Sequence, residues 1–130
     1  MEDLVEVSQG SADDVRWTIL ASLSPDGELL SMVRRRRGRT EATSGMAGPA
    51  LPPGQLVNSW FGQASGLPPF VLVRTAPSVS GVIAVLASGA RIELHLSEVT
   101  AQFGLRFAAA PLPEDDPLVN LISEVADEPE

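Results

Sequence analysis

The stretch VRWTILASLSPDGELLSMVRRRR constrains the fold more than any other part of the chain. From residue 15 to residue 23 every second side chain is apolar, and this period of two is typical of a β-strand with one buried face. In the SPDGE that follows, Pro25 fixes φ, Asp26 can bond its own backbone, and Gly27 permits a positive φ. The alternation then resumes over LLSMVR. The segment therefore predicts a β-hairpin.

The rest of the chain is also sheet-forming. FVLVRTA at 70–76 predicts a strand, and SGVIAVLASGARIELHLS predicts a second hairpin with a tight turn at Ser88 and Gly89. The first strand of that hairpin is almost entirely apolar, so we expect it to be central in a sheet. QFGLRFAAA places its two phenylalanines and its leucine on one face. The 11 glycines and 11 prolines favour many turns and little long helix.

Two segments remain ambiguous in the sequence. LVNSWFGQASGLPP fits a short strand or one helical turn that inserts Trp60 into the core. In DPLVNLISEVADE, residues 117–125 carry a helical stripe after a good N-cap at Asp116, yet the same residues also fit a strand. We prefer the strand because the preceding segments are all sheet-forming.

Together these segments predict an all-β domain, either an antiparallel β-sandwich or a small open barrel of six to seven short strands. The length fits a single domain, which we place at 14–125. An acidic segment at 1–13 precedes it and an acidic tail at 126–130 follows it. Residues 38–55 are rich in Gly, Pro, Ser, Thr and Ala without periodicity, so we expect a long flexible loop there.

Three stretches between about residues 79 and 125 share a recognisable order: VSGVIAVLASGARIELHL, GLRFAAAPLP and PLVNLI. They give a central strand, a glycine turn, an alternating strand, an aromatic strand and a closing strand. In this order the chain resembles the small all-β domains of unknown function that are common in actinobacterial proteins. The resemblance implies a β fold and a strand for the last segment, and it implies no activity.

The charge of the chain is unevenly distributed. The formal net charge is −8, all nine basic residues are arginine, and both ends are acidic. Five of the arginines lie together at the end of the predicted hairpin: Arg34, Arg35, Arg36, Arg37 and Arg39. In a strand their side chains would alternate between the two faces. Because unpaired buried charge is costly, we expect the contribution of this strand to the core to end near Val33.

The residues of catalytic and metal sites are scarce in this chain. There is no cysteine, no lysine and only one histidine, His95, which we place beside Glu93 on the polar face of a strand. We therefore expect no enzyme, no catalytic residue, no metal and no cofactor. The acidic start differs from a secretory signal, and the longest apolar run is too short for a membrane span. These features favour a cytoplasmic protein without a membrane partner.

These observations leave three functions open. We expect a non-enzymatic accessory module that binds another protein through Arg34, Arg35, Arg36, Arg37 and Arg39, or through Trp60 and Phe61. The first alternative is a nucleic-acid-binding regulator that uses the arginine run. The second is a small-ligand binder with Trp17 or Trp60 lining a pocket. Two other roles for the run are a strand end beyond the core or charge protection of an edge strand. The acidic ends could also fold back onto it.

Overall fold

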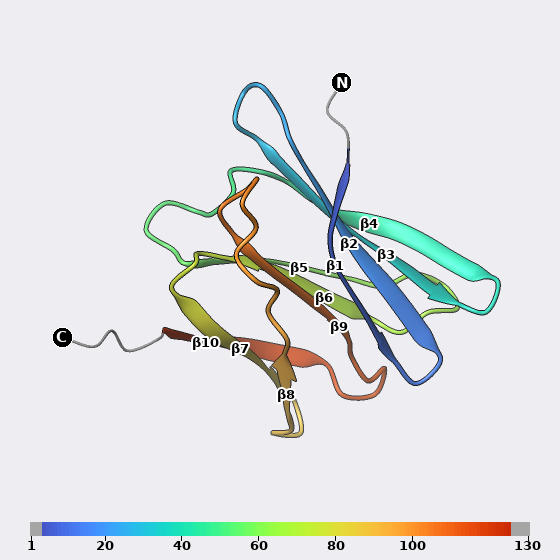
Figure 1. The fold of residues 1–130 in the computed structure, drawn as a ribbon. Helices are drawn as coiled ribbons and strands as arrows, with labels where there is room; N and C mark the ends of the chain where they lie inside the picture. Colours follow the sequence, from blue (N-terminus) through green and yellow to red (C-terminus); the bar gives the residue numbers. More distant parts are fainter. Residues whose placement is uncertain (1–3, 126–130) are drawn as a thin grey trace.

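The computed structural model describes residues 4–125, in which every regular element is a β-strand (Figure 1). The ten strands are β1 (Val5–Ala12), β2 (Val15–Leu23), β3 (Leu29–Arg37), β4 (Thr40–Gly48), β5 (Val57–Gly62), β6 (Phe70–Thr75), β7 (Val79–Leu86), β8 (Arg91–Leu94), β9 (Arg106–Pro111) and β10 (Leu118–Val125). They form three antiparallel sheets: the first sheet β1-β2-β3-β4, the middle sheet β5-β6-β9 and the third sheet β10-β7-β8. The all-β prediction is confirmed, with ten strands in three open sheets and no closed barrel. The acidic tail expected at 126–130 lies outside the described residues.

β2 and β3 form the predicted hairpin and pair without interruption as far as Val15 opposite Arg37. β3 therefore continues well past Val33, and the expectation that its core contribution ends there is wrong, because Arg35 is only 1% exposed. β4 pairs with the other side of β3 along its whole length. Arg34, Arg35, Arg36 and Arg37 thus lie in an interior strand, and Arg39 lies in the turn that follows it. The four strand residues neither project beyond the sheet nor protect an edge.

Two strands occur where the sequence predicts none. The segment 38–55, expected to be a loop, contains β4, and the segment 1–13, expected to precede the domain, contains β1. Their side chains are mostly small or polar, so neither shows the apolar alternation by which strands are recognised. A two-residue turn in which Asp13 has a φ of 53° joins β1 to β2. In β4, an added Cβ at Gly45 would meet the backbone of Ser31, so glycine permits a close approach to β3.

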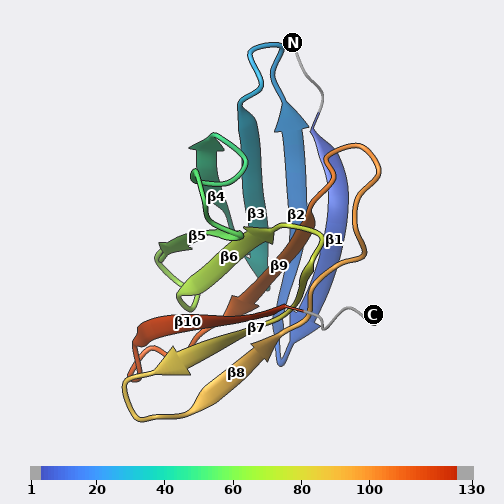
Figure 2. The same ribbon diagram turned by 90° about the vertical axis from the view of Figure 1, so that its left-hand side faces the viewer.

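β6 is the central strand of the middle sheet and is covered on both faces. All six of its residues are buried, which accounts for the nearly continuous apolar stretch at 70–76. Phe70 and Leu72 belong to a core shared with the first sheet, whereas Val71 and Val73 belong to a second core shared with the third sheet. The middle sheet therefore has a hydrophobic core on each face. Figure 2 shows this sheet between the first and third sheets.

The aromatic segments around the middle sheet form strands or pack against them. LVNSWF resolves to β5, and Trp60 packs partly buried against the first core, so the strand alternative for this segment is confirmed. Phe103, Leu105 and Phe107 also join the first core, as predicted for one face. The rings of Phe103 and Phe107 meet edge to face at 6.1 Å between centroids.

The third sheet confirms the second hairpin. β7 is central, between β10 and β8, as its apolar character predicts. β10 is a strand, so the alternative of a helix at 117–125 is excluded. Asp116, an N-cap in the helical alternative, instead accepts hydrogen bonds from the backbone N–H and the hydroxyl of Ser88. These bonds attach the start of β10 to the turn between β7 and β8.

Candidate functional site

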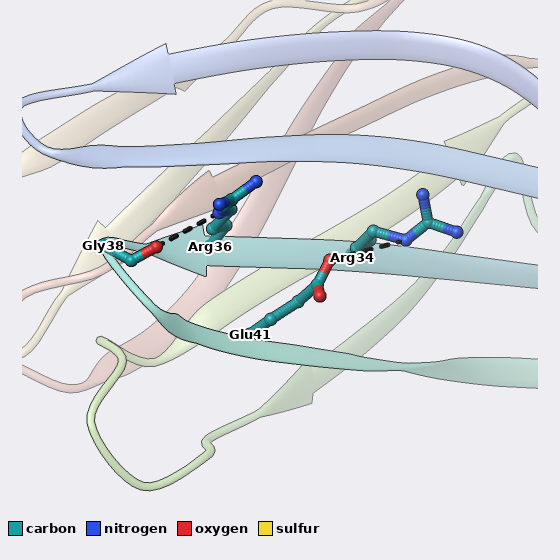
Figure 3. A network of polar contacts seen from close by, with 4 residues as sticks. All are labelled: Arg34, Arg36, Gly38 and Glu41. Atoms are coloured by element: carbon teal, nitrogen blue, oxygen red, sulfur yellow. Dashed lines mark hydrogen bonds and ion pairs between the residues drawn. The ribbon is translucent and has the colours of Figure 1, made fainter.

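The exposed arginines of the hairpin gather on the outer face of the first sheet. Arg16 of β2 lies directly opposite Arg36 of β3, and Arg34 follows on the same face of β3 by strand alternation. All three side chains are exposed. We call this set, Arg16, Arg34 and Arg36, the outer arginine cluster. Figure 3 shows its two β3 members together with Gly38 and Glu41.

Few groups of the chain compensate the charge of the outer arginine cluster. Nε of Arg34 lies 3.9 Å from Oε1 of Glu41, and both side chains are about half exposed, so this ion pair contributes little. Nε of Arg36 donates a hydrogen bond of 3.1 Å to the carbonyl of Gly38 (Figure 3). Within residues 4–125, neither Arg16 nor Arg36 forms an ion pair. Like charges directly opposite in a sheet are destabilising, so the pairing of Arg16 with Arg36 is unfavourable for the fold. Glu41, opposite Arg36 on β4, offsets part of this repulsion.

Apolar side chains lie beside the cluster on the same outer face. Leu20 lies opposite Met32, and alternation along β3 also places Leu30 on this face. Leu20 is only 7% exposed, yet it belongs to neither core, whereas Leu30 and Met32 are half-buried. The outer face of the hairpin is therefore apolar near the SPDGE turn and cationic near the opposite end.

Arg35 points the other way, into the space between the first and middle sheets. Its guanidinium carbon lies 5.5 Å from the ring centroid of Trp60 and 5.6 Å from that of Phe70. Nη2 donates a 2.7 Å hydrogen bond to the hydroxyl of Ser44, while Nε and Nη1 have no partner. Burial lowers the pKa of the Arg35 guanidinium, because removal from water disfavours the charged form. The structure thus brings two predicted contact residues, Arg35 and Trp60, together inside the protein.

The other predicted contact residues are separate from the cluster. Arg37 occupies the inner side of β3 at its end, where Nε lies 3.4 Å from the carboxylate of Asp14. Asp14 adjoins the acidic segment 1–13, and no ion pair within residues 4–125 joins that segment itself to the arginine run. Arg39 is exposed in the turn between β3 and β4. Phe61 is 51% exposed on β5, and alternation with Trp60 directs it away from the first sheet.

Sequence reasoning missed Arg16 and Arg74. Arg16 could have been found from the predicted hairpin, because the register set by the SPDGE turn places Arg16 opposite Arg36. The signal for Arg74 was a single charge in the apolar stretch FVLVRT. Arg74 is completely buried and donates to the carbonyls of Leu29, Pro49 and Ala50 and to the hydroxyl of Ser31: three of the bonds measure 2.8 Å and the bond to Leu29 measures 3.1 Å. Its role is to attach the first sheet to β6.

Neither a metal-binding cluster nor a helix suited to span a membrane occurs within residues 4–125. No group of three or more His, Asp or Glu side chains within residues 4–125 is arranged to hold a metal ion. The same part of the chain has no helix with the length and apolarity of a membrane span. His95 is exposed just beyond β8.

Comparisons with known protein families, with curated proteins and with solved structures found no match to this chain. Of the predicted resemblance, the structure therefore supports a small all-β domain and no particular family.

Proposed function

We propose that the protein is a non-catalytic module whose outer arginine cluster binds an acidic segment of another protein. The observation that carries the proposal is the pairing of Arg16 with Arg36, two exposed cations directly opposite each other that form no ion pair within residues 4–125, although Glu41 lies opposite Arg36 on β4. An anion bound across the pair would remove the repulsion and would accept hydrogen bonds from both guanidinium groups.

The position of β3 argues against a purely protective role for these charges. Charged residues often protect an edge strand from pairing with another chain. β3 is already paired on both sides, with β2 and with β4, so Arg34 and Arg36 cannot serve that purpose for their own strand. A contact function accounts for their position better than edge protection does.

A protein partner fits this face better than a nucleic acid. Proteins that bind single-stranded nucleic acid combine cationic grooves with exposed aromatic rings for base stacking. On β2, the aromatic neighbour of Arg16 is Trp17, which alternation directs inward, where it packs edge to face on Phe70. Leu30 and Met32 instead offer apolar contacts beside the cations. An acidic segment with apolar side chains would match both halves of the face, and the net charge of −8 opposes a polyanionic nucleic acid.

The proposal can be tested with two labelled probes of equal length, a peptide of alternating glutamate and leucine and an oligothymidine. Their affinities would be measured by fluorescence anisotropy at low and high salt. We expect the peptide to bind more tightly, and Arg36→Glu to weaken that binding by about tenfold or more, which corresponds to about 1.4 kcal/mol.

Arg91→Glu is the matched control, because it reverses one exposed arginine on β8, outside the outer arginine cluster. This variant should retain the affinity of the unmodified protein. Tighter binding of the oligothymidine would favour the nucleic-acid alternative. Equal effects of the two substitutions would contradict a specific site at the cluster.

A further inference from the structure

A second surface lies where three open sheet edges meet. β1, β9 and β8 are edge strands of the first, middle and third sheets, and each pairs with one neighbour in the described chain. A cavity of about 400 Å³ lies among them, within the size range of ligand pockets. We call it the three-edge cleft. It is separate from the outer arginine cluster, none of whose residues line it.

The residues that line the three-edge cleft are consecutive within each strand. They are 8–12 along β1, 92–95 along β8 and beyond it, and 109–111 along β9. Neighbouring residues of a strand point to opposite faces, so a cavity against one face would be lined by every second residue. Consecutive residues line a cavity that lies against the backbone edge of a strand. The cleft is therefore bordered by strand edges, where backbone N–H and C=O groups lack strand partners.

The hydrogen bonds of Phe107 show which groups of β9 face the cleft. Its N–H donates to the hydroxyl of Ser97 at 3.0 Å, and its carbonyl accepts from the N–H of Ser97 at 2.8 Å. Both backbone groups of Phe107 thus point away from β6, toward the chain that follows β8. In a strand, residues two apart direct their backbone groups to the same edge. The N–H and C=O of Ala109 and the C=O of Pro111 therefore point into the three-edge cleft.

The side chains around the cleft define what could occupy it. Trp17, Ile92 and Leu94 provide an apolar lining, and Glu93 provides a carboxylate at an exposed position. Glu93 forms no ion pair within residues 4–125. Free strand edges, apolar contacts and an available carboxylate together match an extended peptide with apolar side chains and one basic side chain.

We propose that the three-edge cleft binds such an extended segment of a partner protein by strand addition. The segment would hydrogen-bond to Ala109 and Pro111, place its apolar side chains against Trp17 and Leu94, and direct a lysine or arginine toward Glu93. A length of about four residues suits the short edge of β8. This site is independent of the outer arginine cluster.

The experiment uses the full chain and a pool of capped hexapeptides. Each peptide is built from valine, isoleucine and threonine and carries one lysine at a varied position. The bound peptides are recovered by size exclusion at about 1 mM peptide, since strand-addition contacts of this size are weak. Amide hydrogen exchange then follows the N–H of Ala109. We expect the best peptide to slow its exchange, and N-methylation of alternate peptide residues to weaken binding at least tenfold, because it removes the donors of one edge.

Charge is tested by Glu93→Lys, with Glu98→Lys as the control, since Glu98 is also exposed and lies outside the cleft. Only the first substitution should weaken binding of the lysine peptide. Equal binding of the methylated peptide would overturn the proposal and would indicate a site for apolar small molecules. Unchanged amide exchange at Ala109 under saturation, or no peptide retained from the pool, would also overturn it. So would a dimer, detected by sedimentation, that closes the cleft without peptide.

Discussion

Replacing Arg74 with methionine should show how much of the stability depends on one buried cation. Arg74 lies in β6 without any exposed surface, and its guanidinium donates four hydrogen bonds to three backbone carbonyls and the hydroxyl of Ser31. Burial lowers its pKa by desolvation, so the fold holds a cation that would be more favourable in water. Methionine has a similar apolar stem and no donors, so the substitution isolates the hydrogen bonds.

The magnitude follows from the four acceptors. A hydrogen bond from a charged donor contributes about 1.5–3 kcal/mol, and a buried acceptor left without a partner costs about 1–3 kcal/mol. The four bonds form one network and are not additive, and the carbonyls of Pro49 and Ala50 lie in a loop that could admit water. The substitution also removes the cost of burying the guanidinium. We therefore expect Arg74→Met to lower the free energy of unfolding by about 3–5 kcal/mol.

Arg35→Met is the matched comparison, because Arg35 is equally buried but forms a single hydrogen bond, to Ser44. Its Nε and Nη1 have no partner, so methionine removes a desolvation penalty along with the contacts to two aromatic rings. We expect a change within about 1 kcal/mol of zero. Equilibrium urea unfolding followed by circular dichroism measures both variants. Equal losses for the two arginines would refute the reasoning that hydrogen-bond satisfaction, and not burial, sets their contributions.

The remaining predictions concern the sheets and their turns. Arg16→Ser should stabilise the fold by about 0.2–1 kcal/mol at low salt by removing repulsion from Arg36, since the other cross-strand neighbour of Arg16 is the uncharged Ser11, and the gain should shrink in 1 M NaCl; destabilisation at both salt concentrations would contradict repulsion between the two arginines. Gly10→Val should displace the indole of Trp17, against which an added Cβ would clash, and lower stability by about 1–3 kcal/mol; an unchanged tryptophan emission spectrum would exclude this displacement. Asp116→Ala should destabilise the attachment of β10 to the β7–β8 turn by about 1 kcal/mol, measured by unfolding and by faster amide exchange in β10; unchanged exchange there would show that the attachment is dispensable.

The strands that could be predicted from the sequence are those marked by nearby residues, through apolar alternation and an adjacent turn. The β2–β3 hairpin combines apolar alternation with the SPDGE turn, and the second hairpin combines the apolar stretch of β7 with the turn at Ser88 and Gly89. β1 and β4 were missed because they consist largely of small and polar residues. They become strands because β2 and β3 supply them with backbone partners, and this pairing is a property of the sheet.

The candidate site could be predicted only in part, because some of its residues are brought together by pairing between strands. The sequence places Arg34 and Arg36 together on one face of a strand. The register of the β2–β3 hairpin places Arg16 opposite Arg36 on the same face. The three-edge cleft could not be read, because its residues come from three strands of three different sheets. Nothing local in the chain specifies that these edges meet.

The sequence by itself thus determined an all-β chain, the two hairpins and an alternating arginine run. Only the tertiary structure decided which arginines are available to a partner. Alternation requires Arg35 to face opposite to Arg34 and Arg36, but whether that face is solvent or core depends on what packs against it. Here β5 and β6 bring Trp60 and Phe70 over the guanidinium of Arg35, so its charge is buried against aromatic rings while its neighbours stay in water.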